Sequence, residues 1–388
     1  MKIFKEDFDV EVNSDVAKWI VKISGFTLEE LSNKTKIKKD RLEMWINGKV
    51  KLKFSEIDKI SKIIKKPLTV FILPYPPKEK KLPENWRTVN LEKEKFHPKT
   101  ISLLYKTREI QELTKELAKN INYDLTPKIE FIENISNISA KELGRKYRED
   151  FGLTKELQLK FENPKELFQF LKNKIEERNI LILQLPIPTK DARGFVLTDN
   201  LPFTIVVSTE DDLRARNFTL IHELAHLMLK ISVIDSPLDS LYFTLSEREK
   251  WEKEKWCNDF ASEFLFPEEF LQEKCEKYHE KITKFKILED ISKEYKVSKE
   301  MIIYKLEKLN RISPDTYKKY KEKFEKQKEI FYRIKQPPSH LEIKINQLGK
   351  LFISVVVRNE RTGKITYSDA LDYLSVKSKV YEKLATNM

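Results

Sequence analysis

The chain has little cysteine and no long apolar run. Its 388 residues include only 2 cysteines, Cys257 and Cys275, too few for a disulfide framework or a cysteine-type zinc finger. No stretch of about 18 apolar residues occurs, which excludes an ordinary membrane-spanning helix. The opening residues, MKIFKEDFDVEVN, also lack the apolar run of a secretory signal. We therefore expect a cytoplasmic protein in a reducing compartment, without a membrane partner.

What the chain has in excess is positive charge. The net charge is +12, and charged residues make up 35% of the sequence. With 40% hydrophobic residues the chain can still bury substantial cores, and its length indicates two or three domains. Because lysine is abundant everywhere, the net charge alone does not establish nucleic-acid binding, and the placement of the charges has to decide it.

The N-terminal part contains a series of short amphipathic helices. Apolar residues recur at helical spacing in 14–24, and Gly25 ends this helix. Thr27 and Glu30 form a capping box that opens a second helix, and a turn at 34–37 leads into a third. Two helices joined by a short turn inside a compact bundle are typical of a helix-turn-helix fold.

The stretch FTLEELSNKTKIKKDRLEMWING (26–48) resembles the Xre or lambda-repressor-like family. The resemblance covers residues 1–75 and implies a DNA-binding domain whose recognition helix begins near Lys38, where the family usually has a serine or a similar cap. Lys38, Lys39 and Arg41 would then meet phosphates or guanine edges. The alternatives are a protein-docking module, a degenerate DNA reader, and a helical bundle whose lysine-rich face is simply solvated.

A connector rich in proline and charge follows, and helices then surround a short β-rich region. The connector begins in PYPPKEKKLPENWRTVN (74–90), whose four prolines cannot continue a helix. Three runs at 180–187, 194–199 and 203–208 have strand character. Helices before and after these strands indicate an α+β domain.

The segment FTLIHELAHLML (218–229) carries two histidines four positions apart. His222 and His226 lie on one helical face, so both imidazoles can reach one metal ion, and Glu223 can approach a water on that metal. The flanking residues are apolar, so the helix is expected to be buried, and burying polar rings without partners costs about 1–3 kcal/mol each. A metal ion would remove that cost. The alternative is a core helix whose two histidines have protein partners.

A hydrolytic zinc ion needs a third protein ligand and an open position for water. The segment EKWCNDFASEFLFPEEF (254–270) is expected to form a helix that Pro267 ends, and its Glu254 is the best candidate. His279 is a weaker candidate, because it lies in a charged stretch typical of a protein surface. Cys257 is expected to pack in the core rather than bind metal.

RNFTLIHELAHLML followed by EKWCNDFASEFLFP is similar to the two motifs of the ImmA/IrrE family of zinc metallopeptidases. The resemblance spans 140–310, and 349–384 is similar to the C-terminal segment of longer members. A helix-turn-helix-like pattern in 288–328 is expected to close off the peptidase domain, as a similar piece does in the family. By motif position, the family's zinc ligands fall on His222, His226 and Glu254, its catalytic carboxylate on Glu223, and an asparagine that orients a ligand on Asn258.

The expected architecture is α+β. A helix-turn-helix bundle at 1–75 is followed by a linker at 76–99, a zincin-like domain with a small sheet at 100–310, and a helical and α+β segment at 311–388. An open edge of the small sheet can hold an extended substrate by strand addition, and FTIVVS (203–208) is the expected edge.

These features predict a Zn²⁺-dependent endopeptidase of the gluzincin type. Zinc activates water and polarises the peptide carbonyl, while Glu223 takes the proton and passes it to the leaving amine. The family implies that the substrate is a transcriptional repressor of the Xre type, whose cleavage releases stress-response or mobile-element genes. The alternatives are a DNA-binding regulator or antitoxin-like protein whose peptidase-like domain only senses a signal, and a toxin–antitoxin component.

Overall fold

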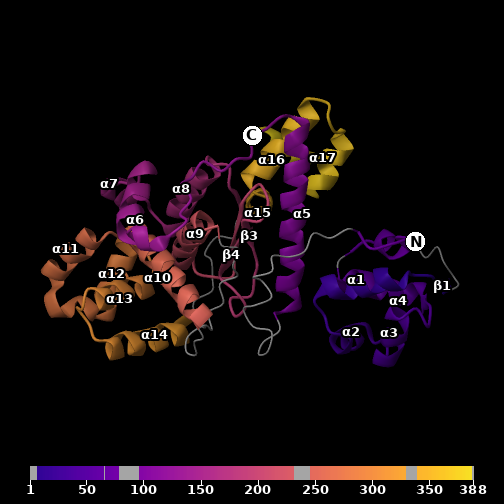
Figure 1. The fold of residues 1–388 in the computed structure, drawn as a ribbon, viewed down its shortest axis with the longest axis horizontal. Helices are drawn as coiled ribbons and strands as arrows, with labels where there is room; N and C mark the ends of the chain where they lie inside the picture. Colours follow the sequence, from indigo (N-terminus) through magenta and orange to yellow (C-terminus); the bar gives the residue numbers. More distant parts are fainter. Residues whose placement is uncertain (1–6, 65, 78–95, 231–244, 329–338, 387–388) are drawn as a thin grey trace. The chain divides into compact units, whose positions relative to one another are not determined.

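The structure is a computed structural model, and most of the residues that it describes are helical (Figure 1). It describes residues 7–64, 66–77, 96–230, 245–328 and 339–386. Within these ranges, no helix combines the length and the apolar character needed to cross a bilayer. The chain divides into two compact units, 1–108 and 109–388, and the division falls inside helix α5 (Pro98–Asn120). Most of the expected linker 76–99 lies outside the described residues.

The N-terminal unit is a small helical bundle. Its elements in chain order are β1 (Asp9–Val10), α1 (Ser14–Ser24), α2 (Leu28–Thr35), α3 (Lys39–Ile46), β2 (Leu52–Lys53), α4 (Phe54–Ile64) and the 3₁₀ helix η1 (Leu68–Ile72). The core includes Ile20, Leu31, Leu42 and Trp45, all with less than 2% of their surface exposed. The expected helical bundle is therefore confirmed, with a two-residue antiparallel ladder between β1 and β2 in addition.

Local capping explains where α2 begins and ends. The Thr27 hydroxyl accepts the Glu30 N–H at 3.2 Å, and the Glu30 carboxylate accepts the Thr27 N–H at 2.8 Å, so the capping box is present. At the other end, Lys36 adopts a left-handed conformation (φ 63°) that turns the chain toward α3. Lys38 gives α3 no side-chain cap, in keeping with its departure from the serine that the Xre-like family has there.

The second unit contains a three-stranded sheet, with helices before and after it in the chain. After α5 come η3 (Ile135–Asn137), α6 (Ala140–Asp150), α7 (Lys155–Lys160), α8 (Pro164–Glu176), β3 (Leu181–Leu185), β4 (Gly194–Leu197), β5 (Thr204–Ser208), α9 (Leu213–Met228), α10 (Leu245–Leu265), α11 (Glu268–Tyr278), η4 (His279–Thr283), α12 (Phe285–Tyr295), α13 (Lys299–Lys308), α14 (Pro314–Lys328), α15 (His340–Leu348), α16 (Lys350–Arg361), α17 (Tyr367–Leu374) and α18 (Ser378–Thr386). The small sheet and the helix that follows it are therefore both confirmed.

The strand order differs from the expectation. The order is β3-β5-β4, with β3 parallel to β5 and β4 antiparallel to it. The expectation that 203–208 forms the open edge is wrong, because β5 (Thr204–Ser208) lies between the other two strands. The short β4–β5 connection forms an antiparallel hairpin, and β3 adds to the far side of β5. The edges of the described sheet are β3 and β4.

The edge at β3 is covered by the C-terminal helices, which pack against it. At Gly349 (φ +74°), between α15 and α16, a Cβ atom would lie 2.6 Å from Leu181 Cδ1 and 2.9 Å from the Ile182 carbonyl oxygen. Glycine is therefore required there both by the backbone conformation and by the close approach. The Lys350 N–H donates to the Glu176 carboxylate at 3.0 Å and fixes the start of α16.

The expected α+β character of 311–388 is wrong. In the described part of this segment every regular element is a helix, including α16, whose sequence KLFISVVVRNER is rich in β-branched residues. Packing overrides the strand propensity, since Phe352, Ile353, Val355 and Val356 are all buried. Asn359 is also buried, and its amide donates to the Leu117 carbonyl of α5 at 2.8 Å.

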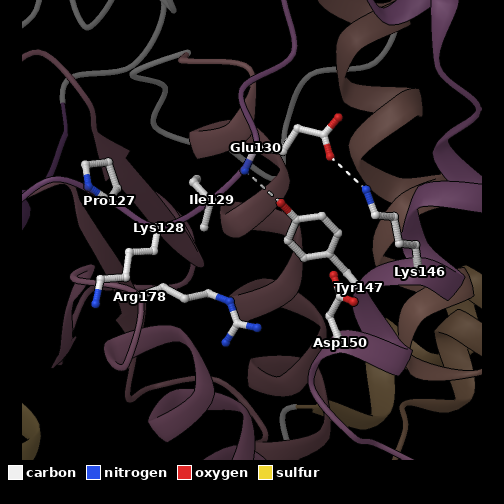
Figure 2. A pocket seen from close by; sticks show the side chains of 8 residues that line it. All are labelled: Pro127, Lys128, Ile129, Glu130, Lys146, Tyr147, Asp150 and Arg178. Carbon is white, nitrogen blue, oxygen red and sulfur yellow. Dashed lines mark hydrogen bonds and ion pairs between the residues drawn. The ribbon is translucent and has the colours of Figure 1, made fainter.

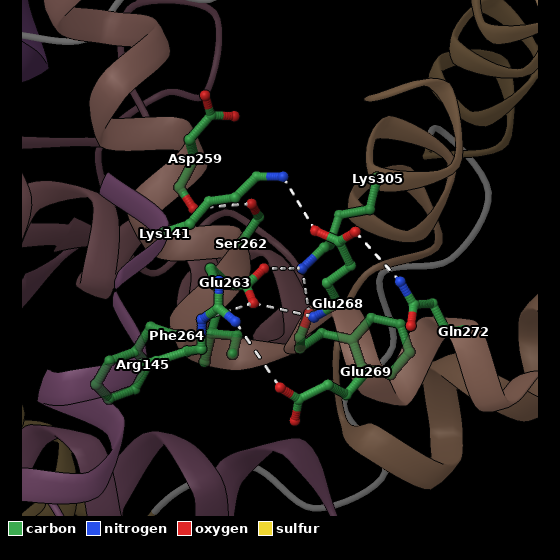
Figure 3. Close-up of polar contacts among 12 residues, drawn as sticks. Lys141, Arg145, Asp259, Ser262, Glu263, Phe264, Glu268, Glu269, Gln272 and Lys305 are labelled. Atoms are coloured by element: carbon green, nitrogen blue, oxygen red, sulfur yellow. Dashed lines mark hydrogen bonds and ion pairs between the residues drawn. The ribbon is translucent and has the colours of Figure 1, made fainter. Parts of the chain in front are cut away.

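A buried ion pair fastens α13 to α10 (Figure 3). Lys305 Nζ lies 2.6 Å from Glu263 Oε2, and both side chains are at most 5% exposed. The other oxygen of Glu263 accepts the Glu268 N–H at 3.0 Å, and Arg145 Nε lies 3.5 Å from it. Burial lowers the pKa of Lys305, and the charge of Glu263 opposes that shift. Within 288–328, helix α13 is therefore tied to α10, the helix that carries Glu254.

We predict that Lys305→Met lowers the free energy of unfolding by about 3–5 kcal/mol, because Glu263 loses its closest cation in a buried place. Denaturant unfolding monitored by circular dichroism measures the change. Lys308→Met is the matched control on the same helix, since Lys308 is 35% exposed, lies 3.7 Å from Glu307 and has its ammonium 5.2 Å from the centre of the Tyr304 ring. Its effect is expected to stay within about 0.5 kcal/mol. Equal stabilities of the two variants would contradict the anchoring role of the pair.

Candidate metal centre

Helix α9 brings the two motif histidines together in the core of the second unit. The Asp212 side chain accepts the Arg214 N–H and caps the helix. One turn separates His222 from His226, and their Nε2 atoms lie 2.9 Å apart. Both side chains are at most 4% exposed, and the Phe218 ring stacks on His222. The burial expected from the apolar flanks is therefore confirmed.

Helix α10 supplies the third polar group. It packs along α9 and places Glu254 against both imidazoles. The Glu254 carboxylate oxygens lie 3.4 Å from His222 Nε2 and 3.2 Å from His226 Nε2. One ligand atom from each residue falls within a span of 4.8 Å. With 32% of its side chain exposed, Glu254 lies on the open side of the cluster.

The three groups fit a zinc ion. Four tetrahedral ligands at about 2.0–2.2 Å from zinc lie about 3.3 Å from one another, and the three separations here are 2.9, 3.4 and 3.2 Å. Burial alone would raise the pKa of Glu254, but the charge of His226 and hydrogen bonds from both imidazoles hold it well below its usual range. Two imidazoles and a carboxylate are a donor set that zinc takes in catalytic sites.

The Glu223 carboxylate is not one of the three converging ligand groups. It is fully buried, and its Oε1 lies close to Gly194 at the start of β4. Because residues 222 and 223 of a helix project about 100° apart, the imidazoles face α10 while this carboxylate faces the sheet. Neighbouring positions of α9 thus supply the candidate ligands and the residue expected to act as the base.

The other candidate residues lie as follows. Asn258 is one turn beyond Glu254 on α10, and within the described ranges its side chain has no hydrogen bond to the three ligands, so its orienting role stays a prediction. Cys257 is fully buried in the hydrophobic core, as expected. His279 is exposed at the start of η4 and does not belong to the cluster.

Residues 175–307 match a family model described as Peptidase_M78, IrrE N-terminal-like domain. This segment of the chain is similar to an IrrE N-terminal-like domain. The resemblance of the two motifs to the ImmA/IrrE family is thereby confirmed, and the matched segment contains the whole metal cluster together with Glu223. The match covers about a third of the chain and leaves out the N-terminal bundle and the C-terminal helices. No curated protein matches the chain.

An open pocket of about 540 Å³ lies elsewhere on this unit, between the 127–130 segment and α6 (Figure 2). It is lined by Pro127, Lys128, Ile129, Glu130, Lys146, Tyr147, Asp150 and Arg178. Its charges are mixed, since Lys146 pairs with Glu130 at 3.1 Å. None of the lining residues belongs to the metal cluster, so size alone does not mark the candidate site of the peptidase domain.

In the N-terminal unit, the three residues expected to meet DNA have different surroundings. Arg41 is held by the bundle itself, because its Nε and Nη2 atoms each donate to the Glu56 carboxylate at 3.0 Å. Lys38 and Lys39 are exposed at the start of α3.

Sequence reasoning missed Gly194. The glycine stands at the beginning of a predicted strand, and a glycine in a strand often marks the close approach of another group. That signal was available in the sequence, but the identity of the approaching group, Glu223, depends on how β4 packs on α9.

We predict that the purified protein binds one Zn²⁺ per chain and that His226→Ala abolishes this binding, because it removes one of three converging ligands. Zinc at about a thousand times its dissociation constant stabilises the fold by about 4 kcal/mol, so chelation should lower the melting temperature of the wild type and added zinc should restore it. Metal analysis and thermal melts measure both effects. Glu223→Gln is the control that should keep the metal, and an unchanged zinc content in His226→Ala would refute the site.

Proposed function

We propose that the protein is a zinc-dependent endopeptidase that cleaves a DNA-binding repressor of the Xre type. The observation that carries the proposal is the convergence of His222, His226 and Glu254 beside the buried carboxylate of Glu223. The match to a metallopeptidase family supports the same reaction class.

The proposed mechanism gives the candidate ligands and Glu223 different tasks. A bound zinc ion supplies a Lewis acid that activates water and polarises the scissile carbonyl. His222, His226 and Glu254 would hold the ion, and Glu254 is the one of the three that is partly exposed. Glu223 accepts the proton of the attacking water at its carboxylate and returns it to the leaving amine. The apolar surroundings of α9 strengthen these charge interactions.

We further propose that the substrate lies along β4. Within the described ranges β4 pairs only with β5, so its second edge is the place where an extended peptide can add to the sheet. Gly194, the first residue of β4, lies directly against Glu223. A peptide paired with this strand would therefore pass the catalytic base.

We predict that Glu223→Gln keeps its zinc and cleaves an Xre-type repressor at least about a hundredfold more slowly, because a glutamine cannot accept the proton. Incubation of the zinc-loaded proteins with the purified repressor, followed by mass spectrometry of the products, measures cleavage. Glu252→Gln, on the exposed face of α10, is the matched control and should cleave normally. A repressor that stays intact with wild type and variant alike would favour the alternative, a regulator whose peptidase domain only senses a signal.

For the N-terminal unit we propose DNA binding through the start of α3, which would bring the peptidase to promoters where its substrate is bound. The exposed Lys38 and Lys39 support this role. Asp40 and Glu43 are also exposed on α3, and their charges would repel phosphates. We therefore expect weak binding that depends strongly on salt.

We predict that replacing Lys38 and Lys39 by alanine weakens DNA binding and lowers the salt slope of the affinity by about one for each lost phosphate contact. Fluorescence anisotropy with duplex DNA over a range of salt concentrations measures the slope. Lys59→Ala, an exposed lysine on α4, is the matched control. If the double variant and the control bind alike, the bundle is a protein-docking module instead.

A further inference from the structure

Gly194 lies in a space that no larger residue can occupy. If it carried a Cβ atom, that atom would be 2.7 Å from Thr219 Cγ2, 2.8 Å from Glu223 Oε1 and 2.9 Å from the Val206 carbonyl oxygen. All three distances are shorter than real Cβ contacts. Backbone and side-chain atoms thus enclose the position from the sheet and from α9.

The backbone conformation is not the reason for this glycine. The described glycines with positive φ are Gly25, Gly48, Gly152, Gly349 and Gly363. Gly194 is not among them, and it is paired in register with Val207 as an ordinary strand residue. The requirement at residue 194 is therefore one of space.

The α9 atoms that crowd residue 194 come from one face of the helix. Thr219 and Glu223 are four residues apart, so both project toward β4. His222 and His226 form the neighbouring face and meet Glu254 of α10. Of the three atoms nearest to a Cβ at residue 194, one belongs to the Glu223 carboxylate and none to His222, His226 or Glu254.

We propose that Gly194 is a positioning residue that sets the place of the Glu223 carboxylate, a role that rests on the proposed peptidase function. The absent side chain lets the strand approach α9 closely enough to confine Oε1 on that side. Misplacement of a reacting group by about 1 Å can cost a hundredfold in rate. Gly194→Ala should therefore impair the reaction and spare zinc binding.

The test compares zinc-loaded wild type with Gly194→Ala and Gly144→Ala. Gly144 of α6 is the matched control, because a Cβ there would also be crowded, at 2.7 Å from the Phe260 carbonyl oxygen, but would not meet Glu223. Crystal structures give the position of Glu223 Oε1, metal analysis gives the zinc content, and mixed-sequence internally quenched peptides give kcat and KM. We expect Gly194→Ala to bind one zinc, to shift Oε1 by about 1 Å, and to lose about a hundredfold in kcat with KM within about twofold. Gly144→Ala should lose stability and keep both kcat and the position of Oε1.

Wild-type kcat in zinc-loaded Gly194→Ala, or an unmoved carboxylate, would overturn the inference. Should Gly194→Ala not fold, Gly194→Ala with Thr219→Ser removes the tightest contact and leaves the contact with Glu223; low kcat in this double variant supports the inference, and wild-type kcat overturns it. If the wild type cleaves neither the peptides nor the repressor, the peptidase proposal fails, and the position of Oε1 in the structures decides the positioning role by itself.

Discussion

The second unit is organised by the burial of α9, a helix that carries two imidazoles and a carboxylate into a hydrophobic core. Polar groups in such a place need partners, and a single helix cannot supply them from its own face. Two elements that pack on α9 therefore have to provide specific contacts. Helix α10 has to place a carboxylate opposite the imidazoles, and β4 has to approach Glu223 without a side chain. The ion pair between Lys305 and Glu263 ties α10 to α13.

The features that depend on local spacing could be predicted from the sequence. The buried α9, its paired histidines and the helix bearing Glu254 follow from a helical period and from the need for a third ligand. Strand order could not be predicted in this way. An apolar run such as TIVVS looks the same in the middle of a sheet and at its edge, because the neighbours that decide its position are remote in sequence.

Two other differences between the expected and the observed structure also arise from contacts between residues that are remote in sequence. Helix α16 contains Val355, Val356 and Val357, a run that favours a strand locally, but its burial against β3 and α5 decides the conformation. Arg41 follows two lysines in an apparent DNA-reading position, yet the folded bundle pairs it with Glu56, fifteen residues along the chain. Sequence shows that an arginine is present near a helix start, whereas its availability to a ligand depends on which carboxylate the fold brings beside it.

Each edge strand of the small sheet depends on a glycine that permits a close approach, and the two glycines serve different contacts. At β3, Gly349 lets the C-terminal helices approach the strand so closely that they cover its edge. At β4, Gly194 lets the strand approach α9 and lie close to the Glu223 carboxylate. A substrate strand has no room beside β3 for this reason, and β5 already has two neighbours. In the proposed peptidase a peptide would have to reach both the sheet and Glu223, and β4 is the strand that offers both.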